Sequence, residues 1–238
     1  MGQGMAKTES TVASGSRRSV LKGAFSVLSL TLCVALLAGV ALRWREIGWG
    51  AWIWLAAFVL MLAIRMPHSV RNRANVIVDA RKDAGEKLLL TAMFVTMMGL
   101  PLLHLATGAF AFADYPLPDW AIGIGVALQL PFLWLFWRSH ADLGRNWSPG
   151  LEVREDHGLV TRGVYKRMRH PMYAAIWLSA LTQPLLVQNW IAGALVIPAF
   201  AAMYFIRVPN EEALMRRRFG DTYDEYCAST GRVLPRLG

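Results

Sequence analysis

Residues Gly158 to Tyr173 concentrate groups that can bind an anion or orient a polar cofactor. The run GLVTRGVYKRMRHPMY holds one histidine, one lysine, three arginines and two tyrosines: His170, Lys166, Arg162, Arg167, Arg169, Tyr165 and Tyr173. Guanidinium and imidazole groups form strong, charge-assisted hydrogen bonds with carboxylates. Pro171 then leads into an apolar segment, and the N–H groups at the start of a helix also bind anions. We expect a site where a charged cofactor meets an apolar substrate at a membrane surface.

A second constellation lies at the end of the last apolar segment. Arg207 and Glu211 are four residues apart and would share one face of a continuous helix, and Glu212 follows directly. Pro209 lies between them and would remove the hydrogen bond to the carbonyl of Phe205. The spacing predicts a kinked helix end with an Arg/Glu pair at the membrane surface. A snorkelling arginine beside an acid in the first turn of a new helix would give the same pattern.

The composition indicates a polytopic membrane protein. Hydrophobic residues make up 55% of the 238 residues and charged residues only 17%, whereas soluble domains average about 25% charged. The net charge of +9 comes from basic residues that lie between apolar segments, and no nucleic-acid-binding motif is visible, so we expect no nucleic-acid partner. The two cysteines, Cys33 and Cys227, give no disulfide framework. The histidines lack the paired spacing of a metal site.

The apolar segments predict an all-α, polytopic membrane helix bundle of about six spans, because a span needs about 20 apolar residues. The last two would form a tight helical hairpin around Gln188-Asn189-Trp190. We expect a disordered tail over 1–19, four transmembrane helices within 20–137, and a catalytic region over 138–238. The predicted spans are Val20–Leu42, Trp49–Ile64, Leu88–Phe112, Trp120–Trp137, Ala174–Val187 and Ile191–Val208.

The distribution of basic residues predicts the orientation. The segments Arg65 to Lys87 and Arg138 to Arg169 are rich in Lys and Arg, whereas Ala113 to Trp120 and the turn at Gln188 have none. The positive-inside rule therefore places both basic segments and both termini in the cytoplasm. The apolar stretch to Leu42 is too long for a cleaved signal peptide and indicates a signal anchor. We favour a prokaryotic cytoplasmic membrane over the endoplasmic reticulum.

Three stretches resemble the isoprenylcysteine carboxyl methyltransferase family and, more broadly, integral-membrane phospholipid methyltransferases. They are LGRNWSPGL from Leu143, GLVTRGVYKRMRHPMY from Gly158, and RVPNEEALMRRRFGDTYDEY from Arg207, and they occur in this order around the hairpin. The resemblance extends from Leu143 to about Arg236. It implies S-adenosylmethionine as cofactor, bound on the cytosolic side by the basic loop and the C-terminal helix. It also implies methyl transfer to a lipid-like acceptor that enters from the bilayer.

The resemblance assigns roles to residues. Arg207 and Glu211 would be catalytic: Arg207 could hold an acceptor carboxylate, and Glu211 could orient that arginine or bind the amine or ribose of the cofactor. The Arg-His-Pro element is followed here by Met-Tyr, one residue shorter than the family pattern. Residues implied in cofactor binding are His157, Leu159, Val160, Gly163, Tyr165, Arg169, His170, Pro171, Tyr173 and Glu212.

Several alternatives stay open at this point. The acceptor could be the carboxylate of an isoprenylated cysteine or the amine of an ethanolamine head group, which would need a base. A sterol-type reductase would need a site for the extra phosphate of NADPH, for which the triplet Arg216 to Arg218 is a candidate. A transporter or scaffold is disfavoured by the lack of an internal repeat. His104 and Gln129, polar residues inside predicted spans, have no assigned role, and the oligomeric state is open.

Overall fold

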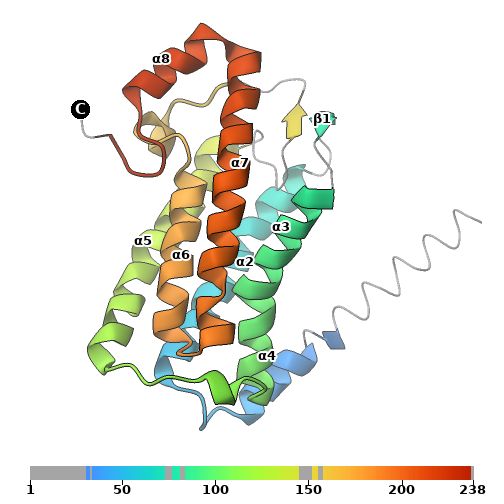
Figure 1. Cartoon of the computed structure of the whole chain (residues 1–238), viewed down its shortest axis with the longest axis vertical. Coiled ribbons are helices and arrows are strands. Elements are labelled where there is room, and N and C mark those ends of the chain that lie inside the picture. The colour runs from blue at the N-terminus through green and yellow to red at the C-terminus, as the bar shows by residue number, and fades with distance from the viewer. Residues whose placement is uncertain are drawn as a thin grey trace, which may run out of the picture.

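The computed structural model describes residues 31–32, 34–72, 77–80, 84–144, 152–154 and 158–236. Within these ranges the chain forms a bundle of long helices (Figure 1). The described part of the predicted first span, residues 31–32 and 34–42, is helical. The predicted tail over 1–19 and the residue His157 lie outside the described residues. The helices that follow are α2 (Trp49–Asn72), α3 (Ala84–Phe94), α4 (Leu100–Thr107), α5 (Asp119–Leu143), α6 (Pro171–Leu186), α7 (Val196–Phe219) and α8 (Asp221–Ser229).

Four segments among the described residues are long and apolar enough to cross a membrane. They are Trp49–Val70, Ala84–Thr107, Asp119–Leu143 and Trp190–Phe219, with mean hydropathy between 1.6 and 1.9. The shorter α6, of 16 residues, lies beside α5 and α7 in the bundle (Figure 1). The protein is therefore an integral membrane helix bundle, and a total of six spans stays a prediction.

Helix ends differ from the predicted span ends. Helix α2 continues to Asn72 rather than Ile64, and α5 continues to Leu143 rather than Trp137. Helix α7 runs through Pro209 to Phe219, whereas the last predicted span ended at Val208. Backbone hydrogen bonding does not stop where apolar sequence stops, so a hydropathy criterion shortens such helices. Helix α7 ends before Gly220, which has a φ of 54°.

The third predicted span contains a π-helical turn and ends early. Residues Val95–Gly99 form the π turn immediately before Pro101, which has no N–H to donate and disfavours an ordinary α-helical turn. Helix α4 then ends at Thr107 instead of Phe112. Gly108 adopts a left-handed φ of 71°, and its N–H donates to the His104 carbonyl at 2.7 Å.

A buried glutamine connects this π turn to a second one at the start of the last span. The Nε2 of Gln183 donates to the carbonyls of Thr96 and Ala192, each at 2.9 Å. Ala192 belongs to the π turn Trp190–Ala194, which follows the predicted hairpin turn. Gln129, whose role was open, is buried and donates to Thr182 Oγ1 at 2.8 Å. These polar residues satisfy hydrogen-bonding groups inside the bundle, as buried polar groups must.

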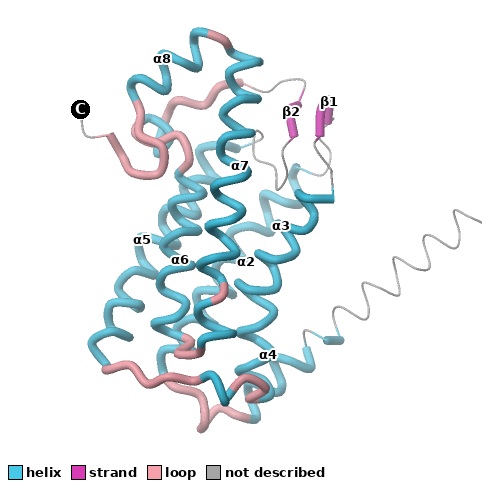
Figure 2. Tube along the Cα trace, viewed as in Figure 1, coloured by secondary structure: helices cyan, strands magenta, loops and turns pink. Residues whose placement is uncertain are grey.

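Two short strands lie outside the bundle, at the same end of the molecule as α8 but on the other side of α7 (Figure 2). Strand β1 (Ile77–Ala80) pairs antiparallel with β2 (Glu152–Arg154). The all-α expectation did not include this pair, because neither segment has the alternating pattern of a longer strand. The pairing connects the α2–α3 segment with the α5–α6 segment. We call this end of the molecule the α8 end, and the opposite end, with the Gln188-Asn189-Trp190 turn, the hairpin end.

Candidate active site

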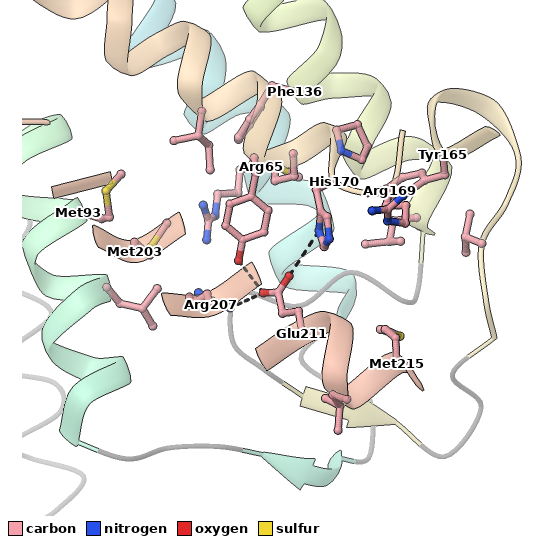
Figure 3. A pocket seen from close by; sticks show the side chains of 18 of the residues that line it. Arg65, Met93, Phe136, Tyr165, Arg169, His170, Met203, Arg207, Glu211 and Met215 are labelled. Atoms are coloured by element: carbon pink, nitrogen blue, oxygen red, sulfur yellow. Dashed lines mark hydrogen bonds and ion pairs between the residues drawn. The ribbon is translucent and has the colours of Figure 1, made fainter. Parts of the chain in front are cut away.

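A cavity of about 630 Å³ opens within the bundle and reaches the α8 end. Its walls come from α2, α3, the π turn, α5, α6, α7, α8 and the basic loop before α6, and Figure 3 shows its charged part. The volume falls within the range of about 300–1,000 Å³ typical of small-molecule sites. The basic loop and the C-terminal part of the chain, where a site was predicted, thus border a space large enough for a small-molecule ligand.

The lining of the cavity changes along the helices. On α7 the lining residues Met203, Arg207, Glu211 and Met215 recur every four residues, so they share one face. On α2, Met61 is followed one turn later by Arg65, which also lines the cavity. Charged and polar residues therefore form a belt between a membrane-side apolar part and an apolar roof at the α8 end. We call this set the polar belt: Arg65, Arg169, His170, Tyr173, Arg207 and Glu211.

The predicted catalytic pair lies in this belt. Arg207 Nη2 is 3.3 Å from Glu211 Oε1, which confirms that the two residues share one helix face across Pro209. The hydroxyl of Tyr173 donates to the same Glu211 oxygen at 2.6 Å. His170 Nδ1 lies 3.8 Å from the other oxygen (Figure 3). Glu211 is thus oriented from three directions while its side chain still lines the cavity.

Arg207 also approaches a second carboxylate. Its Nη2 lies 3.8 Å from Oε1 of Glu86 on α3, and both side chains are buried. Glu86 on α3 therefore helps to hold Arg207 on α7. The sequence did not indicate Glu86 as a site residue. It lies just before a predicted span, and a glutamate is favourable at any helix N-terminus.

Glu212 lies behind the belt and organises it. Its Oε1 accepts hydrogen bonds from Arg169 Nε and His170 Nε2, both at 3.2 Å. Arg232 donates to both carboxylate oxygens, at 3.1 and 2.8 Å. Glu212 is fully buried and does not line the cavity, so it positions Arg169 and His170 rather than facing a ligand. Hydrogen bonding to Glu212 raises the pKa of Arg232.

The C-terminal segment holds the basic loop in place. The N–H groups of Arg169 and His170 donate to the carbonyls of Gly231 and Arg232 at 2.8 and 2.9 Å. Arg169 Nη1 also donates to the Thr230 carbonyl at 2.5 Å. This anchoring by residues 230–232 was not predicted, because backbone pairing between distant irregular segments leaves no sequence pattern.

Two tyrosines hold the basic loop before α6 in place. Tyr226 donates its hydroxyl to the Tyr165 carbonyl at 2.6 Å, and the Tyr165 hydroxyl lies 3.3 Å from the Ser139 carbonyl. Burial raises the pKa of both phenols. They therefore stay protonated and keep donating at physiological pH. Both rings line the cavity, where they offer flat apolar surfaces to a ligand.

Gly163 has a structural reason to be glycine. Its φ is 60°, and a Cβ at this position would collide with the carboxylate of Asp142. Asp142 Oδ2 accepts the N–H of Val164 at 2.9 Å, which ties the loop to α5. Gly163 does not line the cavity. It shapes the loop, although the prediction placed it in the cofactor site.

The structure brings most of the predicted site residues together. The predicted residues that line the cavity are Leu159, Val160, Tyr165, Arg169, His170, Pro171, Tyr173, Arg207 and Glu211. Gly163 and Glu212 lie behind the walls. The arginines Arg216 to Arg218, proposed for an NADPH phosphate, are exposed in the last turn of α7 and do not line the cavity.

Methionines and Arg65 were not predicted as site residues. Seven of the nine methionines within the described ranges line this one cavity. Arg65 was counted as a loop charge because it begins a basic segment, yet it lies inside α2. Its spacing of four residues from Met61 could have indicated a shared helix face.

Comparison with known proteins identifies a family and several relatives that this chain resembles. The model of the isoprenylcysteine carboxyl methyltransferase (ICMT) family matches residues 125–217. Protein-S-isoprenylcysteine O-methyltransferase A of Arabidopsis thaliana is 32% identical over 154 residues, which cover 62% of this chain and 76% of the relative. A probable protein-S-isoprenylcysteine O-methyltransferase of Oryza sativa subsp. indica is 23% identical, covering 78% of this chain and 95% of the relative.

One solved structure is also similar. It is that of the eukaryotic intramembrane Ras methyltransferase ICMT, with a TM-score of 0.43, 22% identity, and coverage of 65% of this chain and 53% of that chain. On the strength of the Arabidopsis relative and the family match, the chain belongs to the isoprenylcysteine carboxyl methyltransferase family. The predicted membership is confirmed, and the protein is a membrane methyltransferase. The reductase and transporter alternatives are not favoured.

Proposed function

We propose that this protein transfers a methyl group from S-adenosylmethionine to the carboxylate of an isoprenylated cysteine or a similar prenyl thiol, forming an ester. The observation that carries this proposal is the Arg207–Glu211 pair, 3.3 Å apart, at the boundary between a methionine-rich apolar space and a charged belt. An amphiphile with a lipid chain and an anionic head matches this boundary. The relatives that bear isoprenylcysteine methyltransferase names support the same acceptor.

The residues of the α8 end fit the cofactor. His170 and Arg169 offer donors for a methionyl carboxylate, and Glu211 offers an acceptor for an amine or a ribose hydroxyl. The rings of Tyr165 and Tyr226, with Leu159 and Val160, provide flat apolar surfaces for a base. When bound, S-adenosylmethionine supplies a methyl group activated by a sulfonium.

The chain contributes orientation and exclusion of water. A carboxylate acceptor loses no proton, so the site needs no base for it. Arg207, held by Glu211 and Glu86, can bind a carboxylate through two parallel N–H groups. We infer that the α8 end faces the cytoplasm, because the basic segments gather there. Residues 138–238 then form the catalytic region, and a lipid chain enters from the bilayer.

A radiolabelled methyl-transfer assay on purified protein tests this function. The acceptors are farnesyl-cysteine with a free carboxylate and, for comparison, phosphatidylethanolamine. We expect a base-labile methyl ester on the farnesyl-cysteine and no label on the amine. Label on the amine alone, or on neither acceptor in folded protein, would refute the proposal.

Arg207→Ala provides the matching mutational test. We expect the rate to fall about 100-fold or more, because the acceptor loses its orientation. Arg217→Ala, which removes an exposed arginine from the same helix, is the control and should keep full activity. Full activity of folded Arg207→Ala would remove Arg207 from the catalytic role.

A further inference from the structure

Arg65 is a charged residue inside a membrane-spanning helix. It belongs to α2, within the span Trp49–Val70, and lines the cavity together with Met61 and Leu62 (Figure 3). Ionisable residues inside membrane helices are costly and usually face a functional cavity. Arg65 lies outside the segment 125–217 that matches the family model, so neither that match nor the sequence motifs assign it a role.

The charges around the belt give Arg65 a specific place. Arg169 lines the cavity, where Glu212 and the Thr230 carbonyl hold it, and the proposed function assigns it to the carboxylate of the cofactor rather than to that of the acceptor. Arg207 lies within 4 Å of two carboxylates, Glu211 and Glu86. Arg207, Glu211 and Glu86 together carry one net negative formal charge. This charge would oppose the approach of an acceptor carboxylate. A further cation on the cavity wall removes that opposition, and Arg65 supplies it.

The position of Arg65 also matches an amphiphile. Met61 precedes it by one helical turn, so a chain lying along Met61 would bring its head to Arg65. Other methionines on the membrane side of the belt, Met93, Met97 and Met203, line the same space from α3, the π turn and α7. Methionine side chains are unbranched and adaptable, which suits a long flexible chain.

We propose that Arg65 binds the carboxylate head of the acceptor, opposite Arg207, and thereby makes the enzyme selective for anionic over amine acceptors. This inference rests on the proposed function, since it concerns the acceptor of the same site. Arg65 is thus an acceptor-binding residue contributed by the N-terminal half of the chain, next to the methionine-lined space that takes the lipid chain.

A binding cycle with two ligands and two proteins tests the contact. The ligands are farnesyl-cysteine with a free carboxylate and the matching carboxamide, and the proteins are wild type and Arg65→Gln. Dissociation constants are measured by calorimetry in detergent micelles. We expect Arg65→Gln to weaken carboxylate binding about tenfold to a hundredfold, as the loss of a charged hydrogen bond does. Binding of the carboxamide should change by less than about threefold, within the effect of a neutral contact.

Each result has a defined meaning. Equal weakening of the binding of both ligands would show that Arg65 only supports the cavity wall. Unchanged binding of both would show that Arg65 only snorkels to the surface. Either result overturns this inference and leaves the proposed function standing. A wild-type protein that binds neither ligand would overturn the proposed function as well. Arg65→Lys keeps the charge and should restore much of the preference for the carboxylate. Arg217→Gln, an exposed arginine on α7, should match wild type with both ligands.

Discussion

Each end of the bundle pairs a histidine with a carboxylate at nearly the same distance. At the α8 end, His170 Nε2 lies 3.2 Å from Glu212 Oε1, and at the hairpin end, His104 Nε2 lies 3.3 Å from Asp114 Oδ1. The first pair adjoins the polar belt, and His170 itself lines the cavity. None of the residues of the second pair lines it. The type and distance of a pair therefore do not distinguish a functional site from a structural one.

The surroundings of the two pairs make the distinction. Asn189 at the hairpin end accepts the N–H groups of Ile191 and Ala192 and donates to the Phe110 carbonyl and Asp114, all at 2.6–2.9 Å. The first two of these bonds close the turn itself, and the other two tie it to the connection that contains Phe110 and Asp114. At the α8 end, Glu212 is buried as Asn189 is, but it fixes Arg169 and His170, which both line the cavity. The comparison teaches that contact with the cavity, rather than the type or distance of the pair, indicates which pair belongs to the candidate site.

Among the substitutions that compare the two ends, removing the carboxylate of the α8-end pair should have the largest effect. In Glu212→Gln, Arg169, His170 and Arg232 lose a charged partner, so the cofactor wall loses its geometry. We expect the KM for S-adenosylmethionine to rise about tenfold to a hundredfold, with a smaller change in the KM for the acceptor. Initial-rate kinetics with each substrate varied in turn measures both values.

The matched control is Glu225→Gln, which changes an exposed glutamate of α8. It should leave both KM values unchanged. If Glu212→Gln bound S-adenosylmethionine as tightly as wild type while staying folded, the α8-end pair would be structural like its counterpart. The comparison would then be broken.

The sequence predicted the residues of the α8 end better than their arrangement. Arg169, His170, Tyr173, Arg207 and Glu211 were all named, because a motif resemblance and an i, i+4 spacing are local patterns. The carbonyls of Gly231 and Arg232 that hold the loop were not predictable, since a backbone contact does not depend on residue type. Arg65 and Glu86 were missed because each has an ordinary reason to stand at the end of a membrane span.

The fold shows the same division between local and distant information. Apolar runs predicted where α2, α5 and α7 lie but placed their ends too early, because the helices continue into polar sequence. His104 and Gln129, the polar residues inside predicted spans, had no role assigned from the sequence. The structure places both away from the cavity: Gln129 donates to Thr182 in the core, and His104 lies beside Asp114 at the hairpin end.

A substitution in the hairpin turn should sharpen the comparison from the other side. Asn189→Ala removes the side chain that caps the π turn and contacts Asp114, and this residue is fully buried. We expect the free energy of unfolding in detergent to fall by about 2 kcal/mol, as for the loss of a good cap. The methyl-transfer rate per folded molecule should stay at the wild-type value. A loss of activity without a loss of stability would show that the hairpin end is coupled to the site.

The smallest effect is expected at His104, and the same substitution at both ends makes the contrast direct. Glutamine keeps a donor near Asp114, and Arg43 still donates to the His104 carbonyl at 3.0 Å, so the end of α4 stays capped in His104→Gln. We expect a stability change below about 1 kcal/mol and unchanged kinetics. His170→Gln should raise the KM for S-adenosylmethionine, because glutamine cannot reach Glu211 and Glu212 together as the ring does. If His104→Gln and His170→Gln had equal kinetic effects, both substitutions would act through the helix bundle as a whole. That result would contradict the assignment of function to the α8 end alone.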